Sequence, residues 1–276
     1  RHLYNNSQKH YIHRTTENMP VGFMYQADGH TLDVYLEHPI SGHGAWRAEI
    51  TLFMDVRSRY VVGWELSGAE SGIATIQAMG RSLLNHDHVP AMLYVDNGCG
   101  YKSKIMNDEA IGFYDRLGID RIFALPGNAK AKGQVERFFR TMERDLNVSF
   151  GEAFCGEGHS KEVARVWHQE VKSGIKKAPS VAQWCQEFTT WLEHYHNRPH
   201  PELKNTTPQA LWQTLGTSSD KTPIHIDPRD LFNARAERVV QRSAVTLDNR
   251  KYFHEILIQH NSRTVVCEYS FNDDEM

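Results

Sequence analysis

Several features that would assign the 276-residue chain to a broad protein class are missing. No apolar run approaches the ~20 residues that span a bilayer, which argues against a membrane-spanning helix. The few cysteines have no paired spacing, which argues against a disulfide framework or a cysteine zinc site and fits a reducing cytosol. They are Cys99, Cys155, Cys185 and Cys267. The Gly127–Gly133 segment continues into Gln134 rather than Lys-Ser/Thr, so it is no nucleotide-binding P-loop.

The N-terminal segment offers little evidence of its own function. His10 and His13 form an H-x-x-H pair, but no C-x-x-C follows, so we do not expect a structural zinc there. The chain opens at Arg1 without an initiator Met or a signal peptide, and we therefore expect a fragment of a longer protein.

A surplus of basic residues is also missing, since the formal net charge is −3. Phosphate contacts normally come from Lys and Arg, so the total charge does not by itself favour a nucleic-acid partner. Basic residues are concentrated locally, however. Residues 229–251 hold six basic and three acidic residues, and residues 130–144 hold five and two. The charge pattern permits a nucleic-acid partner without requiring one.

The order of expected elements favours an α/β fold. Strands come first, and two of them are joined by the short polar turn 57–59, which is typical of a hairpin. A helix, strand, helix, strand and helix follow, which predicts a mixed sheet with helices on its faces. The expected strands and helices are Phe23–Asp28, Thr31–Leu36, Ala48–Val56, Tyr60–Leu66, Ser71–Leu84, Met92–Val95, Asp108–Leu117, Arg121–Leu125 and Gln134–Asn147.

The rest of the chain predicts more helices and then a small β domain. Helices are expected at 160–173 and 180–196 and from Thr207-Pro208, where Pro takes the first helical position. The polar stretch Gly216–Lys221 is the best domain boundary. Short alternating strands follow it and suggest a small β-barrel; they are Arg238–Leu247, Tyr252–Ile258 and Thr264–Phe271. We therefore divide the chain into a lead-in segment 1–20, a catalytic domain 21–215 and a barrel 222–276.

Three acidic residues stand where a shared metal site would need them. Asp28 and Asp96 each follow an apolar run, and ligands gather beyond the carboxyl ends of parallel strands in open sheets. Glu136 lies in the first turns of the expected helix, about 100° from the centre of its apolar face, so it can face the sheet while the helix stays packed. Oxygen-only ligands suit Mg²⁺ or Mn²⁺, and two such ions are the usual apparatus for in-line attack on phosphodiesters.

Each acid also has a structural interpretation. Asp96-Asn97-Gly98 and Asp28-Gly29 are turn signals, and an acid near a helix start favours the helix dipole. The hypothesis therefore depends on all three acids together. Asp55 also ends an apolar strand, but we expect it to cap the hairpin by accepting hydrogen bonds from backbone amides.

Basic residues near Glu136 are candidate DNA contacts. Lys130 and Lys132 precede the helix, while Arg137, Arg140 and Arg144 fall on one exposed stripe of it. Such a stripe can contact phosphates. The alternative is a solvated helix face with Glu143 and Asp145 as partners.

Aromatic and histidine residues near the end of the catalytic domain are expected to be structural. Trp184, Trp191 and Trp212 are expected in the core, and His194, His196 and His200 at a helix end.

Several motifs together resemble the DDE transposases of the RNase H-like integrase superfamily, above all the catalytic core of phage Mu-type transposase. The similar segments are Tyr25–Asp28, Asp55–Trp64, Val95–Gly98, Lys132–Phe138 and Tyr195–His200 with Thr207-Pro208. The resemblance covers about residues 20–272, and the strands after Arg238 look like the small barrel of Mu-type transposases.

The resemblance implies an RNase H-like fold, two Mg²⁺ ions (with Mn²⁺ as a substitute), and DNA end nicking followed by strand transfer. Asp28, Asp96 and Glu136 take the three catalytic and metal-binding places by position. Implied partners are transposon-end and target DNA, further copies of the chain, and an ATPase helper for target selection. The implied location is the cytoplasm of a bacterial cell carrying a phage, prophage or transposon. The Asp96–Glu136 interval is shorter than in Mu transposase, and end-binding domains are missing.

Two other functions fit the same residues. One is an RNase H-like nuclease that hydrolyses DNA without joining it, which an assay for joined products would reveal. The other is a non-catalytic DNA-binding or assembly module derived from a transposase, which would tolerate loss of Asp96.

Overall fold

A computed structural model describes residues 15–39, 44–69, 71–95, 112–123, 133–158, 160–247 and 250–270. A five-stranded mixed sheet forms its centre, in the order β5-β4-β1-β6-β7. β4 pairs antiparallel with β1 and β5, whereas β6 runs parallel to β1 and β7. The strands are β1 (Met24–Thr31), β4 (Glu49–Asp55), β5 (Val61–Ser67), β6 (Met92–Val95) and β7 (Asp120–Phe123). The mixed α/β architecture predicted from the sequence is therefore confirmed.

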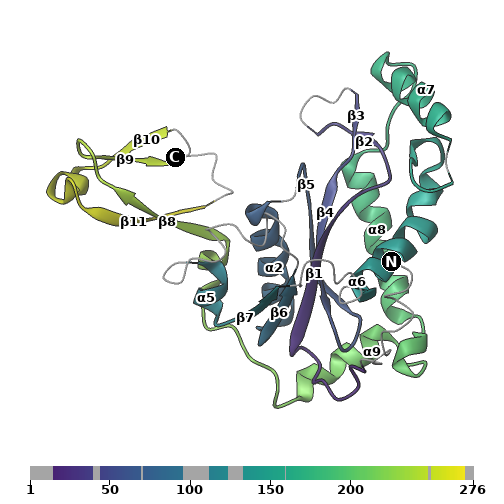
Figure 1. The fold of residues 1–276 in the computed structure, drawn as a ribbon, viewed down its shortest axis with the longest axis horizontal. Coiled ribbons are helices and arrows are strands. Elements are labelled where there is room, and N and C mark those ends of the chain that lie inside the picture. Colours follow the sequence, from purple (N-terminus) through teal and green to yellow (C-terminus); the bar gives the residue numbers. More distant parts are fainter. Residues whose placement is uncertain are drawn as a thin grey trace, which may run out of the picture.

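Helices cover both faces of this sheet (Figure 1). On one face lie α2 (Gly72–His86), α5 (Phe113–Leu117) and α9 (Pro208–Gln213). On the other lie α6 (Gly133–Asp145), α7 (Lys161–Lys172) and α8 (Val181–Asn197). Short elements connect them: β2 (Leu36–Glu37), β3 (Ala45–Trp46), η2 (Asn147–Ala153), η3 (Pro201–Leu203), η4 (Thr214–Thr217) and η5 (Pro228–Phe232). No helix in the described part of the chain has the length and apolar character to cross a bilayer.

The helices begin where the sequence supplies capping side chains. Ser71, Ser180 and Thr207 cap α2, α8 and α9, each accepting a hydrogen bond from a backbone amide three residues later. Such caps satisfy amides that have no partner inside the helix. Pro208 occupies the first turn of α9, as predicted.

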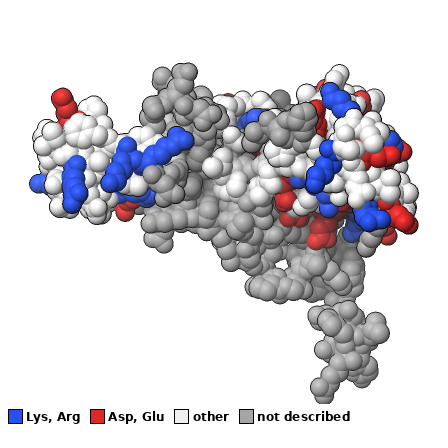
Figure 2. Space-filling model, turned by 90° about the horizontal axis from the view of Figure 1, so that it is seen from above, with Lys and Arg blue, Asp and Glu red and all other residues white. Residues whose placement is uncertain are grey.

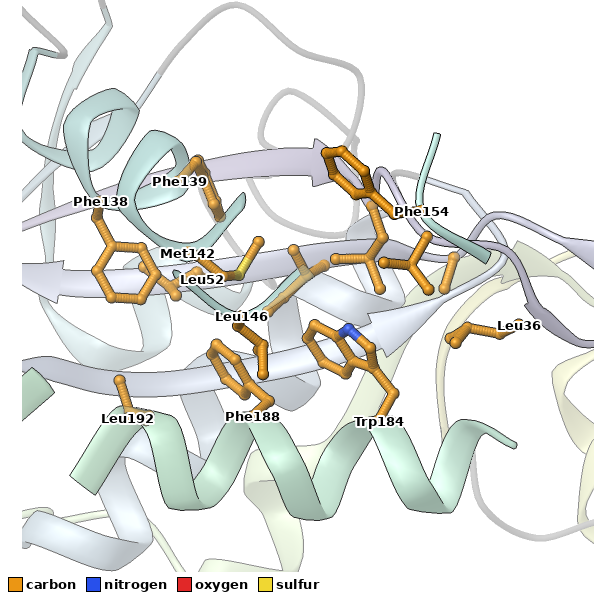
Figure 3. Packing of buried hydrophobic residues seen from close by; sticks show 14 of the residues in the cluster. Leu36, Leu52, Phe138, Phe139, Met142, Leu146, Phe154, Trp184, Phe188 and Leu192 are labelled. Carbon is orange, nitrogen blue, oxygen red and sulfur yellow. The ribbon is translucent and has the colours of Figure 1, made fainter. Parts of the chain in front are cut away.

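The core between the sheet and α6 and α8 is rich in aromatic rings (Figure 3). Trp184 and Phe188 of α8 are fully buried and stack with ring centroids 4.9 Å apart. They face Met142 of α6 and Leu146, the residue directly after α6, across the layer. Burying each such side chain contributes about 1.5–3 kcal/mol. The expected core positions of Trp184 and Trp212 are confirmed, and Trp191 packs at the edge.

The C-terminal part differs from the expected small barrel. Its described residues form two two-stranded sheets, and these do not close into a barrel. β8 (Asn233–Val239) pairs with β11 (Thr264–Ser270), and β9 (Ala244–Leu247) pairs with β10 (Arg250–Phe253). The expected strand 238–247 is divided because Arg242 and Ser243 adopt positive φ. The expected strand 252–258 gives way to the 3₁₀ helix η6 (Glu255–His260), which the His254 side chain caps.

Other limits shift by a few residues. The expected strand 31–36 is wrong: β1 ends at Thr31, and only an isolated bridge at Val34 follows before β2. Thr222–Phe232 leads into the C-terminal strands, and Ile224, Ile226 and Phe232 pack on the α2 side of the sheet. The domain limits drawn from the sequence stay a prediction.

β5 can approach α2 closely because residue 63 is glycine. A methyl group at Gly63 would lie 2.3 Å from the Ala78 carbonyl oxygen of α2. We expect Gly63→Ala to lower the free energy of unfolding by about 1–3 kcal/mol, because a well-packed layer cannot take an extra carbon. Urea unfolding measures this. Gly216→Ala is the control, since a methyl group there meets nothing within 4 Å; equal stabilities of the two variants would refute the close approach.

His196 makes stability depend on pH. It is buried, its Nε2 accepts a hydrogen bond from the Val61 amide over 3.0 Å, and burial lowers its pKa to about 3. Because the folded pKa lies below the unfolded value of about 6.5, the unfolded chain binds the proton first. Stability is therefore complete above pH 6.5 and falls below it, by up to about 1.4 kcal/mol per pH unit from this group.

We expect His196→Gln to remove that part of the slope, measured by urea unfolding between pH 5 and 7. Part of the dependence of stability on pH should remain, because burial also lowers the pKa values of three other histidines, His86, His88 and His200. His194→Gln, at an exposed position of the same helix, is the control. An unchanged slope in His196→Gln would contradict the assignment.

Candidate active site

One face of β1 is directed toward α6. Gln26 accepts a hydrogen bond from the Val135 amide over 3.3 Å, and His30 Nε2 lies 2.7 Å from Glu143 Oε1. Asp28 lies between Gln26 and His30, and alternate strand residues share a face. It is also paired with Leu52, which packs in the core on the α6 side. Asp28 therefore belongs to the β1–α6 side of the sheet. Its side chain is half-buried, and its carboxylate accepts a hydrogen bond from the Gly29 amide over 3.1 Å.

Glu136 lies at the N-terminal end of α6, the end that contacts Gln26 of β1. It is half-buried in the first turn and follows Val135, whose amide contacts β1. The expected buried face of the helix is confirmed, since Val135, Phe138, Phe139 and Met142 are all buried. A carboxylate in the first turn is stabilised by the positive end of the helix dipole. The structure thus brings the elements that carry Asp28 and Glu136 together on one side of the sheet.

Some predicted site residues cannot be assigned a position. Asp96, Lys130 and Lys132 lie outside the described residues, as do His10 and His13. β6 ends at Val95, the residue directly before Asp96 in the sequence.

The predicted arginine stripe is exposed on α6 and largely paired. Arg137 forms an ion pair with Glu202, and Arg144 Nε lies 2.8 Å from Asp145 Oδ1. Arg140 is exposed. Figure 2 shows a second group of basic side chains over the end of the molecule formed by β8–β11. The basic residues of these strands and turns are Arg235, Arg238, Arg242, Arg250, Lys251 and Arg263.

Glu143 has a role that the sequence reading missed. The alternative of a solvated helix face makes Glu143 a partner of the arginine stripe, but its side chain turns toward β1. His30, Asp33 and Glu143 bring one ligand-type atom each within 4.8 Å of one another. Burial, followed by the Glu143 charge, raises the pKa of Asp33, and the Arg47 guanidinium beside it acts in the opposite direction. Glu143 lies seven residues after Glu136, two helical turns along the same face, which was the available signal.

Asp55 is structural, as expected. It is fully buried and accepts hydrogen bonds from the amides of Gly22 and Ser58, over 2.9 and 2.7 Å, and from the Ser58 hydroxyl over 2.6 Å. Burial raises its pKa, while the hydrogen bonds from Ser58 and Gly22 act in the opposite direction. The carboxylate secures the β4–β5 hairpin to the start of β1.

Comparisons with known proteins show which proteins the chain is similar to. A family model described as Mu transposase, C-terminal, matches residues 229–276. The transposase for transposon Tn552 of Staphylococcus aureus is 28% identical over 261 residues, which cover 91% of this chain and 50% of that protein. The resemblance to transposases is confirmed. The chain spans about half the length of the curated relative that it matches.

Two solved structures are similar to the chain. A chain in the cryo-EM structure of the simian T-cell lymphotropic virus intasome in complex with PP2A regulatory subunit B56 gamma has a TM-score of 0.51. The two chains are 12% identical, and the match covers 88% of this chain and 80% of the intasome chain. The catalytic core domain of BIV integrase matches with a TM-score of 0.44 and 13% identity, and the match covers 71% of this chain and 97% of that one. At 12% identity, the likeness to the intasome chain concerns the fold alone.

The contrast between Asp55 and Asp28 can be tested by stability. Asp55→Asn should lower the free energy of unfolding by about 1–3 kcal/mol, because an amide cannot replace both acceptor oxygens in a buried site. Asp28→Asn, at a half-buried position, is the matched comparison and should cost less than about 1 kcal/mol. Urea unfolding of both variants measures the difference. The reverse order of stabilities would contradict the roles assigned to the two acids.

Proposed function

We propose that the chain is the catalytic part of a DDE-type DNA transposase, which nicks transposon ends and joins them to target DNA. Asp28, Asp96 and Glu136 are the proposed catalytic acids and metal ligands, and Mg²⁺ is the proposed ion. The proposal includes DNA as the substrate and an assembly of several copies on DNA. An ATPase helper remains an expectation from the resemblance. The division into a catalytic domain 21–215 and a separate C-terminal domain 222–276 is part of the same proposal.

The parallel pairing of β1 and β6 is the observation that supports this function most directly. Gln26 stands opposite Tyr94 in the described register. Asp28 and Asp96 each follow those paired residues by two positions, so a continued register would set one acid beside the other. The Gln26–Val135 hydrogen bond then holds the first turn of α6, with Glu136, against the same strand.

The donor chemistry fits divalent magnesium or manganese. Carboxylate oxygens are the ligands that these ions prefer, and no cysteine or histidine is needed in the set. When bound, two such ions activate the attacking oxygen and stabilise the leaving oxygen of a phosphodiester. The protein's own contribution is to hold half-buried carboxylates on a rigid strand and a packed helix, so that little rearrangement is needed.

Basic side chains near α6 support a polyanionic substrate. Arg137, Arg140 and Arg144 project from the exposed side of the helix that carries Glu136. Contacts of this kind position the backbone of DNA without reading its sequence. We propose them, with Lys130 and Lys132, as phosphate contacts.

Substitution of single acids tests the proposal. We expect Asp28→Asn, Asp96→Asn and Glu136→Gln each to reduce nicking and joining of a labelled duplex in Mg²⁺ or Mn²⁺ by at least about a hundredfold. Glu187→Gln, at an exposed position of α8, is the control and should keep full activity. Calorimetry with Mn²⁺ alone gives a second measurement, in which the three variants bind the ion more weakly than the control.

The products distinguish the possible outcomes. Joined DNA that depends on all three acids supports a transposase, whereas nicked DNA without joined products supports a nuclease. Full activity of Asp28→Asn would show that the assigned site is wrong.

A further inference from the structure

One carboxylate of the described structure is shared by two arginines from distant parts of the chain. Glu202 of η3 accepts a hydrogen bond from Arg59 Nη2 through Oε2 over 3.3 Å. Its other oxygen, Oε1, accepts a hydrogen bond from Arg137 Nη1 of α6. Arg137 directly follows Glu136 in the sequence, so this contact involves the helical turn that carries a proposed catalytic acid. Two guanidinium groups, one on each oxygen, form the arrangement that also binds a phosphate.

Arg59 retains donors that its surroundings do not satisfy. Its side chain is 7% exposed, yet Nε and Nη1 have no hydrogen-bond acceptor among the described residues. Nη2 reaches only Thr16 Oγ1 at 3.4 Å and Glu202 at 3.3 Å, both long contacts. Burial lowers the pKa of Arg59, and Glu202 is the principal group that acts in the opposite direction. A buried cation with unused donors is costly, so a stronger anion at this point would be favoured.

The backbone of Arg59 is also held in an uncommon conformation. Its φ is +64°, in the left-handed region that side chains other than glycine rarely adopt. Asp55 fixes this turn, because its backbone carbonyl accepts the Arg59 amide over 2.9 Å while its carboxylate binds Ser58. The guanidinium is therefore presented by a rigid hairpin rather than by a free surface side chain.

Further cationic groups surround the shared carboxylate. A pocket of about 200 Å³ opens beside it. The pocket is lined by Glu17, Asn18, Arg57, Glu202, Leu203 and Lys204. Lys204 pairs with Glu17 at 3.1 Å, which leaves Glu202 as the one acid that contacts both Arg59 and Arg137 in the described structure. Although burial acts to raise it, hydrogen bonds and charge from Arg137 and Arg59 leave the pKa of Glu202 below its ordinary value. Glu202 is thus an anion held by two guanidinium groups.

Glu202 can leave this position without unfolding its segment. The backbone around it is held by its own hydrogen bonds, from the Leu203 amide to the His200 carbonyl and from the Thr206 amide to the Leu203 carbonyl. Leu203 is buried and anchors the segment. The Glu202 side chain is 39% exposed, so rotation about its own bonds is enough to move the carboxylate into solvent.

We propose that Arg59 and Arg137 form a binding site for a DNA backbone phosphate, and that Glu202 occupies this site as a substitute anion until DNA displaces it. This proposal deepens the function proposed above, because the ligand is the substrate of that same site. Glu202 would then weaken DNA binding in the free protein, and displacement would free both arginines for one phosphate beside Glu136. Arg59 would be a DNA contact located on the hairpin, far in sequence from the arginine stripe.

Glu202→Gln tests the exchange. We expect this variant to bind a fluorescein-labelled 30-base-pair duplex at least about fivefold more tightly in EDTA, where no chemistry occurs, because a competing surface ion pair of about 1 kcal/mol is lost. The slope of log affinity against log salt should steepen by about 0.9, the value for one more phosphate contact. Glu152→Gln is the matched control, since it removes the same charge from an exposed ion pair with Lys176.

A second pair of variants tests whether Arg137 transmits the effect. In an Arg137→Ala background, Glu202→Gln should tighten binding much less than in the wild-type background. Arg137→Ala alone should weaken DNA binding. If Glu202→Gln fails to fold, as judged by circular dichroism, Arg137→Ala still decides: a normal affinity for DNA with lowered thermal stability would show that the pair only ties η3 to α6.

Equal affinities of Glu202→Gln and Glu152→Gln would overturn the proposal, as would a gain that persists without Arg137. These outcomes leave the proposed function untouched, since it depends on the acid variants in the nicking and joining assay. Conversely, full activity of the Asp28→Asn, Asp96→Asn and Glu136→Gln variants would contradict the proposed transposase function. The DNA affinities of the Glu202 and Arg137 variants would still test the phosphate site.

Discussion

The contact between α6 and β1 is the constraint on which the rest of the candidate site depends. It consists of a hydrogen bond from the Val135 amide to buried Gln26 at one end and the His30–Glu143 pair at the other. Between these ends Phe139 stacks on His30, with ring centroids 4.7 Å apart. Two polar links and one ring contact set the helix parallel to the strand. A carboxylate on the helix then takes its position from packing rather than from its own flexibility.

This contact in turn needs the aromatic layer behind it. Phe138 meets Tyr195 of α8 edge to face at 5.0 Å, and Trp184 of α8 donates its indole N–H to Asn147 Oδ1, just beyond α6, over 3.1 Å. Buried rings bury large areas and resist displacement, and α8, which packs on Trp64 of β5, therefore supports α6 from its side on the same face of the sheet. The opposite face has its own core around α2, which leaves the β1–α6 side free to carry polar groups. The division into two cores explains how a strand can be buried and still present Asp28.

The sequence predicted the elements whose limits follow from local chemistry. The limits of β6 agree because its apolar run ends sharply, and the buried face of α6 followed from the spacing of Val135, Phe138 and Met142. The C-terminal strands were misjudged because Arg242 and Ser243 turn the chain with positive φ, which their residue types do not signal. The pairing of Glu143 with His30 was not predicted because the two residues lie 113 positions apart, and such a pairing exists only once the fold is known. Whether Asp96 joins the other two acids stays a prediction.

The charge balance of the chain has a structural explanation. A net charge of −3 argues weakly against a DNA enzyme as long as charges are summed over the sequence. In the fold, however, acidic residues often pair with the basic ones: Asp145 contacts Arg144 and Arg198, at 2.8 and 3.2 Å, and Glu202 contacts Arg59 and Arg137. An exposed ion pair such as that of Arg144 with Asp145 contributes at most about 1 kcal/mol and is readily exchanged. In the proposed function, each exchange replaces a carboxylate with a phosphate, so the arginines would remain available to DNA although the sequence has no basic surplus. Whether a chain can bind a polyanion therefore depends on how many of its arginines and lysines a polyanion can release from ion pairs, which composition alone does not reveal.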